Sequence, residues 1–78
     1  MNLVYTGRFK KDFKRMIKRN KDEDKLFRVV EILTKGKSLP PKYNNHPLGG
    51  NWGNRRDCHI EPDWLLIYSV QGNDLILE

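Results

Sequence analysis

The sequence RRDCHIEPDWLLIYSVQGNDLIL, residues 55–77, predicts consecutive strands joined by short turns, and it decides the fold class. Polar and apolar side chains alternate in the first part of this stretch. Successive side chains of a strand point to opposite faces, so we expect Asp57, His59 and Glu61 to share one face. The stretch therefore begins with a strand that presents a polar face.

Turn signals divide the rest of the stretch into two further strands. Pro62 is expected to turn the chain after the first strand. The largely apolar residues 64–70 are consistent with a second strand that is buried on both faces. The pair Gly72-Asn73 predicts a tight turn, and residues 75–77 predict the last strand.

Two helices are predicted upstream, after a short opening strand at residues 2–5. The first begins near Arg8, and its apolar side chains recur at helical spacing: Phe9, Phe13, Met16 and Ile17. The second shows the same spacing before Gly36: Leu26, Val29, Val30 and Leu33. Helices followed by hairpin strands predict an α+β fold of order β-α-α-β-β-β, with two antiparallel helices packed on a mainly antiparallel sheet.

The size and composition predict one small domain over residues 1–78. No apolar run approaches the roughly 20 residues that cross a bilayer, so no membrane association is expected. The single Cys58 cannot form an internal disulfide, which favours a location in the reducing cytoplasm. We expect Cys58 to be a small residue of the core. The His, Cys and acidic residues lack the paired spacings of metal sites, so we expect no metal and no other cofactor.

The charge distribution indicates a polyanionic partner. Fifteen Lys and Arg against ten Asp and Glu give a net charge of +5, and eight basic residues lie between Arg8 and Lys21 with only Asp12 opposing them. Nucleic acid or the ribosome is the expected partner, and a solvated helix face is the alternative. The RNA-binding candidates on this helix are Lys10, Lys11, Lys14, Arg15 and Lys18.

Residues 46–64 hold the candidate chemistry, since they contain both histidines and both tryptophans. RNA is cut without a metal when its 2′-hydroxyl attacks the adjacent phosphate, which needs a base, an acid and positive charge. We expect His46, His59 and Asp63 to converge if the proline-rich loop before residue 52 folds over the strand. Each residue also has a non-catalytic interpretation. His46 would be an exposed loop residue, His59 would pair with a neighbouring acid, and Asp63 would form a turn.

The neighbouring side chains carry similar alternatives. Asp57 either orients His59 or pairs with Arg55, and Arg55 is the better candidate for phosphate than the next arginine. Trp64 is either a core residue or a platform that stacks on a base, and Trp52 has the same two interpretations.

Three motifs resemble the YafQ branch of the RelE/ParE toxins: HPLGGNW at 46–52, RDCHIEPDW at 56–64 and LLIY at 65–68. The residues YTGRFKKD at 5–12 and the pair Leu39-Pro40 also match. The resemblance implies a RelE-like fold and the toxin of a type II toxin–antitoxin system. It implies a ribosome-dependent, metal-independent mRNA endonuclease that forms a hetero-oligomer with a cognate antitoxin of the DinJ or RelB kind.

By the same resemblance, His46, His59 and Asp63 match catalytic positions of the family, and Asp57 matches a supporting acid. Family members continue past the position of Glu78 with a segment that contains an arginine and a histidine. We therefore expect weakened activity, or, as the alternative, a catalytically inactive toxin remnant that binds an antitoxin or RNA. A gyrase-directing relative of the same fold is a third interpretation, and the two histidines argue against it.

Overall fold

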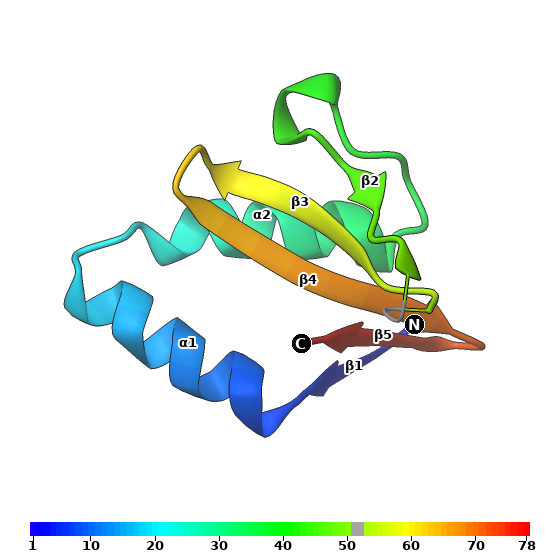
Figure 1. Cartoon of the computed structure of the whole chain (residues 1–78), viewed down its shortest axis with the longest axis horizontal. Helices are drawn as coiled ribbons and strands as arrows, with labels where there is room; N and C mark the ends of the chain where they lie inside the picture. Colours follow the sequence, from blue (N-terminus) through cyan, green and yellow to red (C-terminus); the bar gives the residue numbers. More distant parts are fainter. Residues whose placement is uncertain (51–52) are drawn as a thin grey trace.

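The computed structural model describes residues 1–50 and 53–78 and consists of two helices packed on a five-stranded sheet (Figure 1). In chain order the elements are β1 (Asn2–Tyr5), α1 (Gly7–Lys18), α2 (Glu23–Thr34), the 3-10 turn η1 (Pro41–Tyr43), β2 (His46–Pro47), β3 (Arg56–Glu61), β4 (Trp64–Gln71) and β5 (Asp74–Leu77). The strand order in the sheet is β1-β5-β4-β3-β2. Among the strand pairs of the described residues, β1–β5 is parallel and the others are antiparallel. The predicted α+β fold with two helices on a mainly antiparallel sheet is confirmed.

Local signals place the ends of the elements. The Thr6 hydroxyl accepts a hydrogen bond from the backbone N–H of Phe9 at the start of α1, and the Asp22 carboxylate accepts one from Asp24 at the start of α2. Gly36 has φ +70° just beyond α2, as expected for a residue that ends a helix. Gly72, at φ +58°, makes the tight turn between β4 and β5.

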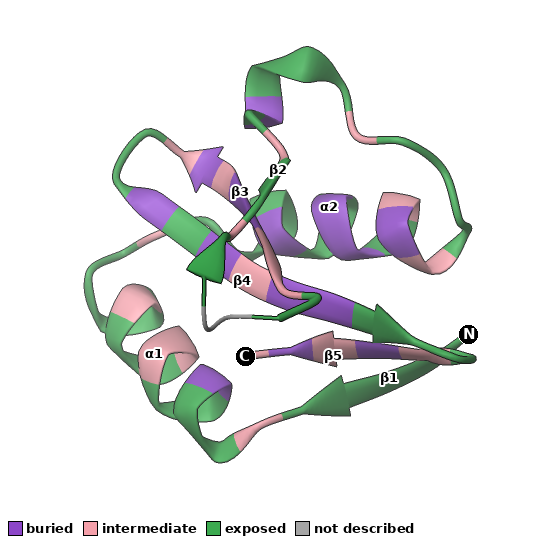
Figure 2. Ribbon diagram, turned by 45° about the vertical axis from the view of Figure 1, so that its right-hand side comes forward, coloured by how far each residue is buried: buried purple, intermediate pink, exposed green. Residues whose placement is uncertain are grey.

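The core lies between the two helices and one face of the sheet. In Figure 1 the two helices run in opposite directions, and Figure 2 shows buried residues on α2 and on the central strands. The buried hydrophobic residues are Phe9, Leu26, Val29, Val30, Leu33, Tyr43, Cys58, Ile60, Trp64, Leu66, Tyr68, Leu75 and Leu77. Because these side chains include alternate residues of β3 and β4, the helices cover one face and leave the other open.

The prediction that residues 64–70 are buried on both faces is wrong. Trp64, Leu66 and Tyr68 are buried, but Leu65 between them is 52% exposed and Ile67 is half-buried. The reason is that an apolar run alone does not distinguish a strand covered on two faces from one covered on a single face. In this chain both helices pack on the same side.

The irregular segment before β3 contains structure that the sequence analysis did not predict. β2 pairs with the start of β3, and η1 lies just before it. A second irregularity, a β-bulge, shifts the register between His59 and Glu61. The prediction that Glu61 shares the face of His59 is therefore wrong. Glu61 forms ion pairs with Lys21 and Lys25 on the helix side.

Candidate active site

The short β2 strand places a histidine against a buried carboxylate. His46 is the cross-strand partner of Asp57, and its Nδ1 atom lies 3.0 Å from Oδ1 of Asp57. The two atoms are within ion-pair distance, but their direction is not that of a good hydrogen bond, and Oδ1 accepts none from any described residue. Nδ1 also lies 3.4 Å from the carbonyl oxygen of Pro47. The two side chains are 54% and 10% exposed, so an exposed imidazole covers a nearly buried acid.

The residue before His46 holds this strand in place. The side-chain oxygen of Asn45 accepts hydrogen bonds from Nε of Arg56 at 3.2 Å and from the Tyr68 hydroxyl at 2.9 Å. Burial raises the pKa of Tyr68, so its hydroxyl remains a donor at neutral pH. After the strand, the backbone N–H of Leu48 donates to the carbonyl of Arg55 at 3.0 Å. The position of His46 is therefore set on both sides.

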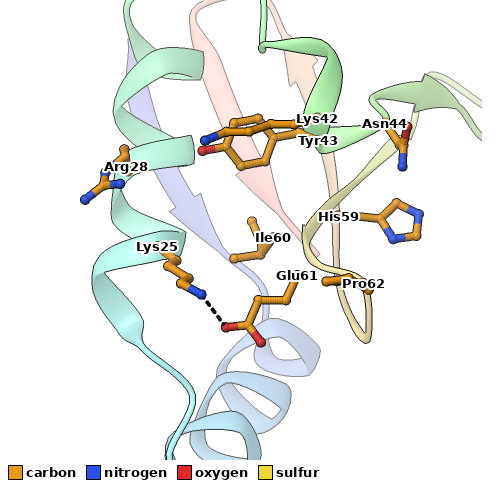
Figure 3. A pocket seen from close by; sticks show the side chains of 9 residues that line it. All are labelled: Lys25, Arg28, Lys42, Tyr43, Asn44, His59, Ile60, Glu61 and Pro62. Carbon is orange, nitrogen blue, oxygen red and sulfur yellow. Dashed lines mark hydrogen bonds and ion pairs between the residues drawn. The ribbon is translucent and has the colours of Figure 1, made fainter.

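His59 follows Asp57 on the same strand and the same face. The two residues are separated by about 7 Å along the strand, and no bulge intervenes. His59 is half-buried and lines a pocket of about 380 Å³ between α2, η1 and the end of β3 (Figure 3). The structure thus brings His46, Asp57 and His59 to one face of β2 and β3, and His59 lies at the edge of a pocket that residues of α2 also line.

Asp63 does not join this group in the structure. It lies in the turn between β3 and β4, and Nζ of Lys21 is 2.9 Å from each of its carboxylate oxygens. The same Nζ atom is 3.0 Å from Oε1 of Glu61, whose Oε2 is 3.2 Å from Lys25. The hydrogen bond from Lys21 lowers the pKa of Asp63, and the bonds from Lys21 and Lys25 lower that of Glu61. Both acids are therefore ionised at neutral pH.

Two of the other candidates are engaged elsewhere. Nε of Arg55 donates to Oε1 of Glu78 at 2.8 Å. Trp64 is 5% exposed within the core, so its ring offers no face to a base. Of its two interpretations, the core residue is the one that agrees with the structure. Trp52 lies outside the described residues.

The basic side chains of α1 are exposed, whereas Phe9 is buried and Phe13 and Met16 pack against the core. The exposed candidates are Lys10, Lys11, Lys14, Arg15 and Lys18. α1 follows β1, and β2 lies at the other edge of the sheet (Figure 1). The basic helix surface and His46 consequently lie toward opposite sides of the molecule.

The structure adds residues that the sequence analysis missed. The cations Lys25, Arg28 and Lys42 line the pocket beside His59. A sequence signal exists for the first two, since residues three apart on a helix share one face. Nothing in the sequence pattern indicated that this face would meet the end of β3.

Cys58 is fully buried, and this burial, with a smaller contribution from Asp57, raises its pKa to about 12. Among residues 1–50 and 53–78, no three His, Cys, Asp or Glu side chains are grouped as a metal site requires. Within the same ranges, no helix has both the length and the apolar character needed to span a bilayer.

Two helices on one face of a mainly antiparallel sheet, in this order, form the fold of RelE-like toxins, since solved toxin structures superpose on this chain. The family model for the bacterial toxin of type II toxin–antitoxin systems, YafQ, matches residues 1–78, so the chain belongs to this family.

Known proteins with similar sequence and structure agree with this assignment. The mRNA interferase toxin YafQ of Escherichia coli K12 is 43% identical over 70 residues, which cover 88% of this chain and 76% of that protein. A copper-bound mutant toxin from Helicobacter pylori superposes with a TM-score of 0.97 at 36% identity, covering 100% of this chain and 89% of that one. In the E. coli DinJ–YafQ complex, the matching chain gives a TM-score of 0.90 at 41% identity, covering 99% of this chain and 87% of that one.

Proposed function

We propose that this chain is an mRNA interferase, an endoribonuclease that acts as the toxin of a type II toxin–antitoxin pair. The observation that carries the proposal is the position of His46, Asp57 and His59 on one face of β2 and β3. Two imidazoles beside a carboxylate are suited to proton transfer near neutral pH. The name of the E. coli relatives, mRNA interferase toxin YafQ, supports the same activity.

The reaction uses the 2′-hydroxyl of the RNA as its nucleophile. A base removes the 2′ proton, the 2′ oxygen bonds to phosphorus, and the bond from phosphorus to the 5′ oxygen breaks. An acid then donates a proton to that oxygen, which leaves a 2′,3′-cyclic phosphate and a 5′-hydroxyl. In this proposal His46 and His59 supply the two proton-transfer groups. Asp57 orients His46 through their close contact, as a carboxylate orients a catalytic histidine in other enzymes.

Asp63 is the remaining acid of the proposed catalytic set. Lys21 lowers its pKa, so Asp63 stays ionised at neutral pH and is suited to stabilise positive charge rather than to accept a proton. Its position in the turn directly after β3 places it near the end of the strand that carries His59. We assign it a role in the reaction that depends on its negative charge.

The proposed substrate is mRNA in the ribosomal A site, in the cytoplasm. The exposed cations of α1 support contact with ribosomal RNA, because phosphate contacts by Lys and Arg supply much of the affinity for nucleic acid. The solved DinJ–YafQ complexes support a cognate antitoxin of the DinJ or RelB kind as the partner of this chain. We propose that this antitoxin neutralises the toxin in a hetero-oligomer.

Mapping of RNA 5′ ends in a translating bacterial extract tests the proposal. We expect the wild-type chain to produce new 5′-hydroxyl ends only while the message is being translated. His59→Ala and His46→Ala should each lower the cleavage rate by about 10²–10⁴-fold. Lys35→Gln, at an exposed ion pair beyond α2, is the control that should cleave like wild type. Absence of new ends together with tight antitoxin binding would replace this proposal with the inactive binding module.

A further inference from the structure

We propose that the pocket beside His59 is a subsite for the RNA strand and binds the backbone phosphate of a nucleotide next to the cleaved bond. This inference rests on the proposed function, because it takes His59 as the reacting end of the site. The pocket lies between α2, η1 and the end of β3, as Figure 3 shows. Its volume of about 380 Å³ is within the range of protein pockets that hold small ligands.

The charge of the pocket favours an anion. Arg28 and Lys42 line it from α2 and η1, and neither forms an ion pair with a described residue. Nζ of Lys42 lies 5.1 Å from the centre of the Tyr43 ring. The side-chain cations therefore face the pocket from two elements without a carboxylate of their own, and Arg in particular binds phosphate through two parallel hydrogen bonds.

The one acid of the pocket does not cancel this charge. Glu61 is held at Oε1 by Lys21 and at Oε2 by Lys25, at 3.0 and 3.2 Å. In Figure 3 the Glu61 side chain points toward Lys25, whereas the His59 ring points the opposite way. Lys21 also contacts both carboxylate oxygens of Asp63, so Lys21 and Lys25 balance the charges of Glu61 and Asp63. The net positive charge of the pocket therefore comes from Arg28 and Lys42.

The geometry favours a phosphate over a base. Tyr43, which lines the pocket, is 7% exposed, so its ring does not offer an open stacking face. Asn44 has a left-handed backbone, with φ +48°, at the end of η1, and its amide lies on the same side of the pocket as His59 (Figure 3). Amide N–H groups and cations that line one pocket can donate hydrogen bonds to phosphate oxygens from different sides.

Binding of a short RNA that carries a 2′-deoxy nucleotide at the cleavage site tests the subsite without cleavage. We expect Arg28→Gln/Lys42→Gln to weaken binding at least tenfold and to reduce the salt slope of log K by about 0.7 for each phosphate that the variant no longer binds. Lys35→Gln/Lys37→Gln removes the same charge beyond the C-terminal end of α2 and is the matched control. Equal reductions of affinity and slope in the two double variants would overturn the inference.

Two further measurements separate its parts. An RNA without bases at the flanking positions should keep the difference in affinity between the two double variants, and disappearance of that difference would overturn recognition of phosphate.

In the translating extract, Arg28→Gln/Lys42→Gln should raise KM and leave kcat near wild type. If the wild-type chain cleaves and this variant has the same KM as the control, the subsite proposal is contradicted and the proposed function is not. If no chain cleaves, the nuclease proposal fails and with it the assignment of this pocket to a reacting RNA strand. Thermal unfolding of each variant verifies that it is folded.

Discussion

Nδ1 of the exposed His46 lies 3.0 Å from Oδ1 of the nearly buried Asp57, across the β2–β3 pair. A carboxylate loses its hydration when it is buried, so a close polar partner matters more for Asp57 than for His46. The same contact therefore stabilises the fold and orients a group that we propose to be catalytic.

A double-mutant cycle tests this contact. We expect His46→Ala to lower the free energy of unfolding by about 1 kcal/mol, because the 3.0 Å contact with Oδ1 of Asp57 is lost while removal of the exposed imidazole lets water reach that oxygen. The same substitution should cost less in the Asp57→Asn background, since a neutral amide is easier to bury than a carboxylate. Urea denaturation of the four proteins gives the coupling, expected at about 0.5–1 kcal/mol. Additive effects would show that the two side chains do not interact.

The Lys21 ion pairs should make stability depend on pH in the acid range. Lys21 lowers the pKa of Glu61 and Asp63 below their ordinary values of 4.5 and 3.8, so their contribution is present above those values. It is lost as the pH falls through the lower pKa values of the folded state. We expect thermal unfolding of Lys21→Met to depend less on pH than that of wild type below pH 4.5. Lys42→Met, which removes a lysine without an ion pair among the described residues, should retain the wild-type dependence.

Cys58 should be unreactive in the folded protein. Burial raises its pKa from 9.0 to about 12, so the thiol is neutral and inaccessible at pH 8. The unfolded chain ionises first, so stability should fall above pH 9.0 by about 1.4 kcal/mol per pH unit from this group. Alkylation with iodoacetamide, with and without urea, measures the first effect. Comparison with Cys58→Ala isolates the second, and fast alkylation of the folded chain would contradict both.

Substitution of Trp64 should affect stability rather than RNA contact. Trp64→Ala removes a large buried side chain, and we expect the free energy of unfolding to fall by about 3–5 kcal/mol. Trp64→Phe fills much of the same space and should bind RNA within twofold of wild type. A large decrease of RNA affinity in a well-folded Trp64→Phe protein would indicate that Trp64 contacts RNA.

The basic surface of α1 should contribute to binding through its charge. Lys10→Gln/Lys14→Gln is expected to leave stability within about 0.5 kcal/mol, because both side chains are exposed. Its binding to ribosomes should weaken and become less sensitive to salt, with a log–log slope smaller by about 0.7 for each phosphate that α1 no longer neutralises. Salt titrations beside Lys35→Gln/Lys37→Gln measure the difference. Identical slopes for both variants would leave α1 as an ordinary solvated helix.

The sequence by itself determined the helices, the hairpin strands and the family. Apolar residues at helical spacing, the acids at the start of α2 and the turn at Gly72 act over a few neighbouring residues, so local patterns predict them. The motifs between residues 46 and 68 were sufficient to indicate the YafQ family, which the family model confirms. The basic character of α1 was equally visible in the sequence.

The tertiary structure alone decided which side chains meet. In the structure His46 lies opposite Asp57, and a bulge separates Glu61 from His59. Lys21 forms an ion pair with Asp63, which is 42 residues away in the sequence. The tertiary structure also buried Trp64 and arranged the cations of α2 and η1 around His59. Such contacts depend on strand register and on which face of the sheet the helices cover. A shift of one residue in register turns every side chain of a strand to the opposite face, and short-range patterns do not specify it for a two-residue strand.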